Sequence, residues 1–501
     1  MISGEEVLKH NTRESCWVIV HGQVYDVTTF LDDHPGGADV VLRHAGKDVS
    51  EIYEPLHPKG IIKETLNDGE VNDALLRSYV DEYIGADQIL GPVDLRSNIT
   101  KALPESAGKD PASSQEGPLP LSLCMNLDDI EMSACRIMSR RAVTFITSAA
   151  DSLASLTQNR KDWSKLTFRP RVLRDVTRAD MTCHVLGKKS RLPFFIAPMG
   201  MAKIANDEGE LALVRGAVAN DIPYCVSGYS SIRHADLIAC QKEVGGGGIL
   251  WYQLYVSKSG CETTRQMVRS ARDLGYEALF ITVDVPVVGK REEDERYKAE
   301  LDYAAGHFSQ SSSGEGAPVL RGMHSYTLSW SDLSYIREEW GPSSGPVVLK
   351  GIQSAEDAKM AADLGFDGIY LSNHGGRQLD YAPSSMKTLL EIRRFCPEIL
   401  DKVQVFVDGG VRRGTDIVKA LCLGATAVGV GRPFNYGIAL NGVEGCNKVV
   451  QLLSDEIQTT MRLLGATELG QLGPEMVNST ILENRLPQYL SFFKSSSSPK
   501  L

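Results

Sequence analysis

The sequence predicts an α/β fold, a (β/α)8 TIM barrel preceded by a small α+β domain, and three observations support this prediction. Eight short apolar, β-prone runs alternate with helical segments between residues 194 and 430. A stretch rich in Pro, Gly and Ser precedes this region. The content of 42% hydrophobic and 23% charged residues is typical of a globular chain. We therefore expect an N-terminal domain at 1–83, a linker at 84–122, a barrel at 123–480 and a tail at 481–501.

The barrel is predicted from the order of its elements. The apolar runs lie at residues 194–197, 224–226, 249–255, 278–283, 347–349, 368–371, 403–407 and 427–430. Segments between them, such as 354–366 and 414–425, carry apolar residues at spacings of three and four, which indicates helices with one buried face. Eight such units favour a closed barrel over a doubly wound sheet.

One connection of the predicted barrel is abnormally long. Between Gly289 and Pro346 the chain contains the charged stretch KREEDERYKAE and then the low-complexity HFSQSSSGEGAP. We interpret this insertion as an active-site lid or a protease-sensitive loop, with an insertion of no function as the alternative.

Composition and charge exclude several classes of function. The net charge of −11 disfavours nucleic acid as a partner, and no run of about 18 apolar residues predicts a membrane span. The ten cysteines form no CxxC pair, so we expect reduced thiols and no zinc site. Residues 1–83 contain 7 Lys and Arg against 16 Asp and Glu, a balance of −9. This acidic domain suggests docking to a basic protein, although solubility alone would also explain it.

The N-terminal domain contains two candidate metal ligands. His34 lies in an HPGG motif between a hairpin-like and a helix-like segment, and His57 follows 23 residues later. By itself, HPGG indicates only a turn. The segments CWVIVHGQVYDVTTFLDDHPGG and AGKDVSEIYEPLH resemble the cytochrome b5 family over nearly the whole domain. The resemblance implies haem b with His34 and His57 as axial ligands, and therefore electron transfer without an open iron site. His44 is a rival candidate that matches no ligand position of that family.

Polar residues follow the apolar runs of the barrel, at the strand ends where barrels of this type carry their active sites. They are Ser227, Gln253, Tyr255, Thr282, Asp284, Lys350, His374, Arg377, Asp408 and Arg432. The motif SNHGGRQLD places a base and a carboxylate-binding arginine on one turn. VDGGVRRG and GVGRP end the last two runs, where glycine amides and arginine favour a phosphate. No GxGxxG opens a strand-to-helix unit, which counts against NAD.

The segments SNHGGRQLDY, VFVDGGVRRGTD, YQLYV, TVDVP and KALCLGA are similar to the FMN-dependent 2-hydroxy acid dehydrogenase and oxidase family, over about residues 123–470. With the haem domain in front, the architecture resembles the flavocytochrome b2 group. The resemblance implies FMN, a small 2-hydroxy acid substrate and a basic electron acceptor such as cytochrome c, and we expect a homotetramer.

The resemblance also implies a role for each site residue. His374 is the base, Asp284 stabilises its imidazolium, Tyr255 bonds the substrate hydroxyl, Arg377 and Arg291 clamp the carboxylate, and Lys350 stabilises the reduced flavin. The residues expected to contact FMN are Met199, Gly200, Ser227, Gln253, Thr282, Lys350, Asp408, Gly409, Gly410, Arg412, Gly431 and Arg432.

The sequence departs from this family around the substrate. Phe145 stands where the family has a tyrosine, Met199 and Gly200 replace its usual Thr-Ala, and Tyr229 occupies a pocket-lining position. We expect an apolar wall of Phe145, Met199 and Tyr229, and a substrate bulkier or more apolar than lactate.

The sequence leaves two other functions and three compartments open. An oxidase would pass the electrons to oxygen and make hydrogen peroxide, and a decayed barrel would be a non-catalytic haem or flavin protein. The full set of His374, Arg377 and Lys350 disfavours decay. We expect a cytoplasmic protein because no leader precedes the first domain. The peroxisome, suggested by the weak C-terminal address PKL, and the mitochondrial intermembrane space are the alternatives.

Overall fold

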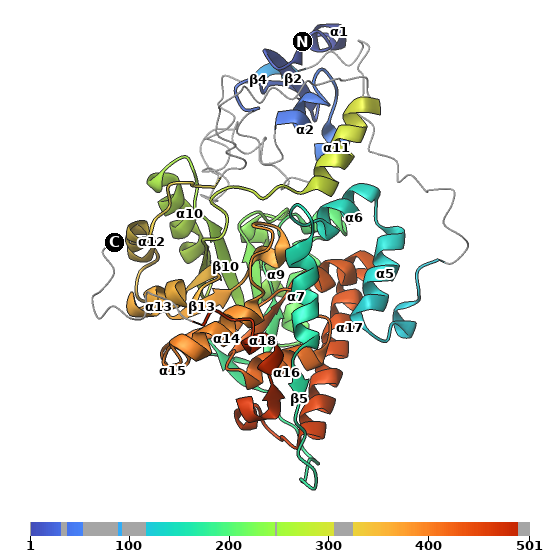
Figure 1. The fold of residues 1–501 in the computed structure, drawn as a ribbon. Coiled ribbons are helices and arrows are strands. Elements are labelled where there is room, and N and C mark those ends of the chain that lie inside the picture. Colours follow the sequence, from blue (N-terminus) through green and yellow to red (C-terminus); the bar gives the residue numbers. More distant parts are fainter. Residues whose placement is uncertain are drawn as a thin grey trace.

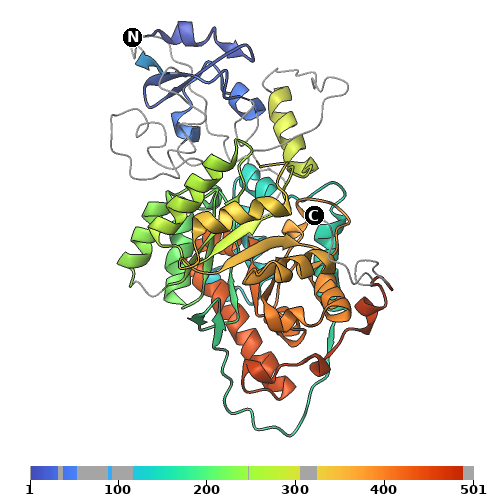
Figure 2. The same ribbon diagram turned by 90° about the vertical axis from the view of Figure 1, so that its left-hand side faces the viewer.

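The computed structural model describes residues 2–31, 38–53, 89–92, 117–245, 248–304 and 324–488. Figure 1 shows a small N-terminal domain beside helix α11 at one end of a larger domain, and Figure 2 shows the same arrangement from the side. The two predicted domains are confirmed in type. The predicted haem ligands His34 and His57 lie outside the described residues.

An antiparallel sheet forms the centre of the N-terminal domain. Its strands lie side by side in the order β1 (Asn11–Thr12), β2 (Ser15–Val20), β3 (Gln23–Asp26) and β4 (Ile89–Pro92). His21 and Gly22 both have positive φ, 49° and 78°, in the two-residue turn between β2 and β3, as a hairpin turn that matches the strand twist requires. Strand β4 comes from the segment predicted to be the linker, and it pairs with β3. The first sheet therefore includes chain from beyond residue 83.

Short helices and an apolar cluster complete this domain. The described helices are α1 (Gly4–Val7), α2 (Ala38–Leu42) and α3 (Ser50–Tyr53). Alternate residues of β2, Cys16, Val18 and Val20, point to one side of the sheet and pack with Tyr25 and Phe30. The hairpin and the following helix that the sequence predicts are thus both present.

Within the described residues, eight parallel strands close into the predicted barrel, which confirms the fold class. The strands are β8 (Phe194–Ile196), β9 (Tyr224–Ser227), β10 (Leu250–Tyr255), β11 (Leu279–Thr282), β12 (Val347–Ile352), β13 (Gly368–Leu371), β14 (Gln404–Val407) and β15 (Ala427–Val430). The connecting helices are α8 (Glu210–Ala219), α9 (His234–Glu243), α10 (Cys261–Leu274), α12 (Leu333–Trp340), α13 (Ala355–Asp363), α14 (Ser385–Phe395), α16 (Gly414–Cys422) and α17 (Arg432–Leu464).

Additional elements surround the barrel. They are α5 (Leu127–Ile137), α6 (Arg140–Thr147), α7 (Ala154–Ser164), the hairpin β6 (Cys183–Val185) with β7 (Lys188–Ser190), and α11 (Glu292–Ala304). The charged stretch of the predicted insertion forms α11, which contacts α6 through the ion pair of Arg140 with Glu300 at 2.5 Å. Residues 305–323, with the low-complexity part of the insertion, lie outside the described residues. No described helix combines the length and the apolarity that a membrane crossing requires.

A layer of large side chains fills the lower part of the barrel. Each strand contributes one buried residue to it, and these are Phe195, Cys225, Trp251, Phe280, Val348, Tyr370, Phe406 and Ala427. Trp251 stacks on Phe280 with ring centroids 5.1 Å apart, and Val185 and Leu186 of the β6–β7 hairpin belong to the same cluster. Since side chains two residues apart in a strand share a face, the next inward residue of each strand lies directly above this layer.

We predict that Gly429→Ala destabilises the barrel, because a Cβ at this position would lie 1.9 Å from the Tyr370 hydroxyl oxygen. Overpacking of this kind costs roughly 1–3 kcal/mol. Thermal unfolding followed by circular dichroism measures the loss.

Gly470→Ala is the matched control, because nothing lies within 4 Å of a Cβ there. Adding Tyr370→Phe to Gly429→Ala should recover part of the stability by removing the nearest atom. A melting temperature of Gly429→Ala equal to that of the control would contradict the predicted clash.

Candidate active site

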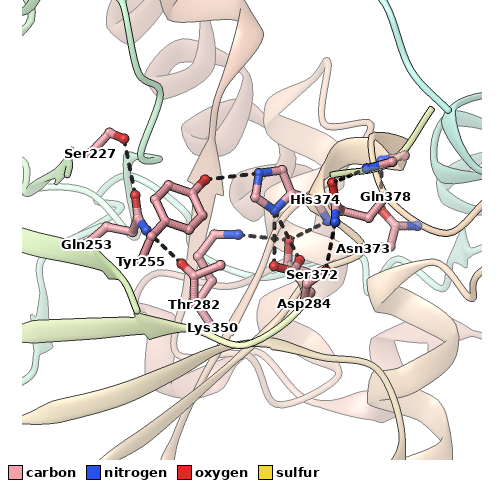
Figure 3. Close-up of polar contacts among 12 residues, drawn as sticks. Ser227, Gln253, Tyr255, Thr282, Asp284, Lys350, Ser372, Asn373, His374 and Gln378 are labelled. Atoms are coloured by element: carbon pink, nitrogen blue, oxygen red, sulfur yellow. Dashed lines mark hydrogen bonds and ion pairs between the residues drawn. The ribbon is translucent and has the colours of Figure 1, made fainter. Parts of the chain in front are cut away.

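The inward residues above the aromatic layer are polar and form the floor of the site. Two positions beyond the layer, six strands carry Ser227, Gln253, Thr282, Lys350, Ser372 and Asp408. Gln253 accepts a hydrogen bond from the Ser227 hydroxyl at 3.2 Å and donates one to the Thr282 hydroxyl at 2.8 Å (Figure 3). Because side chains alternate in direction along each strand, the neighbouring strands β9, β10 and β11 place these three polar side chains in one hydrogen-bonded chain.

The next inward positions carry the acid–base residues. Asp284 follows β11, and its carboxylate oxygens lie 3.1 and 3.2 Å from Nδ1 of His374, which follows β13 (Figure 3). The hydroxyl of Tyr255, at the end of β10, lies 3.3 Å from Nε2 of His374. Because Nδ1–H donates to the carboxylate, the neutral imidazole has its free electron pair on Nε2. The geometry therefore leaves Nε2 as the proton acceptor, next to the Tyr255 hydroxyl.

Electrostatics keep this histidine neutral at physiological pH. Burial lowers the pKa of His374, and although Asp284 opposes this effect, Lys350 adds to it. Burial would raise the pKa of Asp284, but its interactions with His374 and Lys350 more than compensate and lower it. A neutral imidazole beside an ionised carboxylate can accept a proton and then be stabilised as imidazolium.

The turn that carries His374 is strained and is held by α7. His374 has a φ of 58°, a left-handed conformation that costs a non-glycine residue about 1 kcal/mol or more. Asn373 and Asn159 exchange two side-chain hydrogen bonds of 2.8 Å, and Ser372 accepts a bond from the His374 amide at 3.0 Å. A Cβ at Gly376 would lie 2.6 Å from the backbone nitrogen of Leu156. These contacts fix the base against its own backbone preference.

Lys350 is buried on the floor between two carboxylates. Its side chain is 4% exposed, and its ammonium lies 3.4 Å from the Ser372 hydroxyl. Burial alone would lower the pKa of Lys350, but Asp284 and Asp408 outweigh that effect and raise it. Lys350 is thus a fixed positive charge under the site.

Three half-buried arginines, Arg291, Arg377 and Arg432, lie around the base. Burial and the charge of Arg291 lower the pKa of Arg377, and burial also lowers the pKa of Arg291. Nε of Arg291 is buried and has no hydrogen-bond partner among the described residues. Arg377 donates through Nη1 to the carbonyls of Phe145 and Ser148, each at 2.9 Å. An anion placed between Arg291 and Arg377 would relieve their repulsion.

Arg432 occupies a different environment from that expected of a phosphate ligand. Its three nitrogens donate to the carbonyls of Ile146, Gly375 and Ser148 at 2.9–3.1 Å. It therefore connects the end of α6 to the turn of His374. Arg412 pairs with Glu131 at 2.7 Å, whereas its Nη1 is buried without a partner among the described residues.

The glycine turn after β14 contacts the same helix that supports His374. Gly409 and Gly410 have φ of 89° and 75°, and a Cβ at Gly410 would lie 2.5 Å from the Asn159 backbone. Trp163 of α7 donates to the Gly409 carbonyl at 2.9 Å. Met199 lies next to Gly431 after β15, since its sulfur is 3.7 Å from the position of a Cβ there. The predicted FMN residues therefore come from strand ends that surround one site.

The donor set fits FMN. Oδ1 of Asp408 and Nη1 of Arg412 are buried without partners in the described part of the chain, as expected of groups that bind a ribityl hydroxyl and a phosphate. The polar chain of Ser227, Gln253 and Thr282 suits the polar edge of a flavin ring.

Sequence reasoning missed several residues of this site. Asn373 directly precedes His374 within a recognised motif, which could have indicated its role. Gln378 donates to the carbonyls of Asp284 and Val287 at 3.0 and 2.8 Å and so holds the Asp284 loop. Asn159 and His324 lie far from any motif, so their roles appear only in three dimensions.

The barrel and its base, carboxylate and cation set define a flavin-dependent oxidoreductase. Residues 134–479 match the FMN-dependent dehydrogenase family, and residues 3–84 match the cytochrome b5-like haem/steroid binding domain. The chain belongs to the FMN-dependent dehydrogenase family. It is an FMN- and haem-dependent 2-hydroxy acid dehydrogenase.

Curated and solved relatives share both domains or the barrel. The chain is 36% identical to an L-lactate dehydrogenase (cytochrome) of Wickerhamomyces anomalus over 488 residues, which cover 97% of this chain and 81% of that protein. A flavocytochrome b2 variant with pyruvate bound matches at a TM-score of 0.66 and 34% identity, covering 76% and 94% of the two chains. An (S)-mandelate dehydrogenase from Pseudomonas putida matches at 0.62 and 31%, covering 71% and 99%.

We predict that Asp284→Asn slows substrate-driven flavin reduction by at least ~10²-fold at pH 7, because the imidazolium loses its carboxylate partner. Asp284 raises the pKa of His374 against the lowering by burial, so its loss lowers that pKa further. Protonation of the base would then begin at a lower pH, and the acidic limb of the pH profile moves down. Stopped-flow flavin reduction across pH measures both effects.

Asp363→Asn is the control, because this exposed carboxylate bonds Lys359 on α13, on the outside of the barrel. An acidic limb that moves to higher pH in Asp284→Asn would contradict the predicted coupling.

Proposed function

We propose that the chain oxidises an (S)-2-hydroxy acid to the 2-oxo acid and delivers the electrons through its haem domain to a basic acceptor such as cytochrome c. The observation that supports the chemistry best is the hydrogen-bonded series Asp284, His374 and Tyr255 beside two half-buried arginines. His374 Nε2 removes the proton from the substrate Cα, and Asp284 stabilises the charge that results.

The remaining groups orient the substrate. Arg291 and Arg377 bind its carboxylate, whose negative charge offsets the burial that lowers both pKa values and the repulsion of Arg377 by Arg291. The Tyr255 hydroxyl bonds the substrate hydroxyl and fixes Cα–H toward Nε2. Burial raises the pKa of Tyr255 and lowers the pKa of His374, as expected of groups in a medium less polar than water.

FMN is held by Ser227, Gln253, Thr282, Asp408, Arg412, the glycine turn and the residues around Met199, Gly200 and Gly431. When bound, FMN would take up the two electrons released at Cα together with the hydroxyl proton, and haem b would pass the electrons on one at a time. Lys350 places a buried positive charge under the site, where a reduced flavin would be negative. Arg432 acts by positioning the His374 turn.

The departure at Phe145 affects how the substrate is held. Its ring lies under the Arg377 guanidinium, 5.3 Å from ring centroid to Cζ, and its carbonyl accepts from the same arginine. Phe145 therefore steadies Arg377 through its ring and backbone and offers the substrate no hydroxyl. The expected wall is not apolar throughout, because the Tyr229 hydroxyl lies 3.3 Å from Nδ1 of His324.

The charge of the N-terminal domain supports the proposed acceptor, and the assembly is proposed from the resemblance alone. The balance of −9 over residues 1–83 suits docking to a basic protein. An oxidase that reduces oxygen is the alternative. We also propose a homotetramer and keep the domain limits given above, with β4 added to the first sheet. A cytoplasmic location stays a prediction from the sequence.

The central test is flavin bleaching by a panel of 2-hydroxy acids without oxygen. We predict that His374→Gln retains FMN but slows bleaching by about 10²- to 10⁴-fold, because the proton acceptor is lost. His184→Gln, an exposed histidine on β6, is the control. Bleaching at the wild-type rate in His374→Gln would exclude this residue as the base.

The acceptor is tested in the same preparation. Turnover in air with ferric cytochrome c should reduce the cytochrome and yield little hydrogen peroxide. Peroxide in proportion to substrate, with cytochrome c unreduced, would establish the oxidase alternative.

We predict that His34→Ala and His57→Ala each abolish haem retention while FMN binding remains normal, because each removes an axial ligand. The absorption spectrum of the purified protein, which we expect to be six-coordinate and low-spin in the wild type, reports the haem. His44→Ala should retain the haem, and loss of haem in His44→Ala alone would move the ligand assignment to that residue.

A further inference from the structure

His324 is a buried titratable side chain in the active site that the mechanism above does not use. It is 9% exposed, lies within the insertion, and is the first described residue after residue 304. Its backbone forms a bridge with Ser257, and the Ser325 amide donates to the Val256 carbonyl at 2.8 Å. This pairing holds the backbone of His324 against the segment that follows β10, and it fixes the position of the His324 ring.

Three rings meet at this place. The His324 and Tyr255 centroids are 4.4 Å apart, and Tyr229 stacks on Tyr255 at 4.9 Å. The Tyr229 hydroxyl lies 3.3 Å from Nδ1 of His324. Because Tyr255 also contacts His374, the Tyr229–His324 pair lies one ring away from the base.

The pair presents a hydrogen-bond donor. Burial is the main cause that lowers the pKa of His324 to about 4, with smaller contributions from His374 and Arg291, so the ring is neutral at pH 7. When the Tyr229 hydroxyl donates to Nδ1, the ring proton is on Nε2. Among the described residues, Tyr229 is the one hydrogen-bond partner of the His324 ring. In this tautomer, which we assign to the ring, Nε2–H remains available to a ligand.

Gly200 makes room for this arrangement. A Cβ at Gly200 would lie 2.8 Å from the Tyr229 carbonyl oxygen and 3.1 Å from the Tyr229 Cβ. The Met201 amide also donates to that carbonyl at 3.0 Å. Gly200 and Tyr229 are thus in close contact, and a larger residue at position 200 would displace Tyr229.

We infer that Tyr229 and His324 bind the side chain of the substrate and favour 2-hydroxy acids whose side chain carries an uncharged hydrogen-bond acceptor, such as a carboxamide. This inference rests on the proposed function. With the carboxylate at the arginines and Cα at His374 Nε2, the substrate side chain has to leave in a third direction. The ring cluster of Tyr255 and His324 borders that nitrogen, because the Tyr255 hydroxyl lies 3.3 Å from it. A buried N–H donor that meets an apolar side chain loses its hydration without replacement, which penalises apolar substrates.

The test compares two substrates of nearly equal shape, (S)-2-hydroxysuccinamate and (S)-2-hydroxy-4-methylpentanoate, whose side chains end in a carboxamide and an isopropyl group. The holoenzyme should have a higher kcat/KM for the carboxamide. His324→Leu should lower the carboxamide-to-isopropyl ratio by roughly 5- to 150-fold, the range expected when a buried polar group loses its partner. Tyr229→Phe should lower it by less, because the imidazole proton is then free to move to Nδ1.

His324→Gln and Tyr326→Phe complete the experiment. Glutamine retains an N–H donor and should restore part of the ratio, which a purely structural role would not produce. Tyr326 is 54% exposed, and its substitution should leave the ratio unchanged. A wild-type preference for the isopropyl substrate, or an equal ratio in wild type and His324→Leu, would overturn the inference. Failure of every 2-hydroxy acid to bleach the flavin would instead overturn the proposed function.

Discussion

The closed ring of parallel strands with its aromatic layer is the constraint on which the rest of this structure depends. Trp251, Phe280, Tyr370 and Phe406 pack against one another in the interior of the barrel. The charged side chains in the layer above it therefore lie against an apolar surface, where their electrostatic interactions are stronger than in water. The shifted pKa values of Lys350, Asp284 and His374 are consequences of that position.

The charge balance of the site explains what it binds. Lys350, Arg291, Arg377 and Arg432 bring four positive charges near the base, whereas Asp284 and Asp408 bring two negative ones. Arg432 is satisfied by backbone carbonyls, but Arg291 retains an unpaired buried nitrogen. Such an excess is costly until an anion enters, which supports the proposed binding of the substrate carboxylate between Arg291 and Arg377.

Much of the fold and part of the site could be predicted from the sequence. The barrel could be predicted because short apolar runs alternate eight times with segments whose apolar residues have helical spacing. The observed strands differ from the expected runs by few residues. The His374–Asp284 contact was implied by the family resemblance, and the two residues follow β11 and β13, which β12 separates in the barrel. The partners of Asn159 and His324 could not be predicted, because 214 residues separate Asn159 from Asn373 and only closure of the barrel brings them together. The environment of Arg432 was missed because a sequence shows an arginine but not which carbonyls surround it.

Helix α7 contacts two turns that are proposed to bind different ligands, the substrate at the His374 turn and the cofactor at the glycine turn. Asn159 bonds Asn373 beside the base, while the backbone at Asn159 and the side chain of Trp163 pack against the glycine turn after β14. A ligand that orders one turn must therefore reduce the conformational freedom of the other through the same rigid helix. By thermodynamic linkage, the affinity for the cofactor's phosphate and the order of the strained His374 turn rise and fall together. The apoprotein should thus be less ordered at the base, although no cofactor atom has to touch α7.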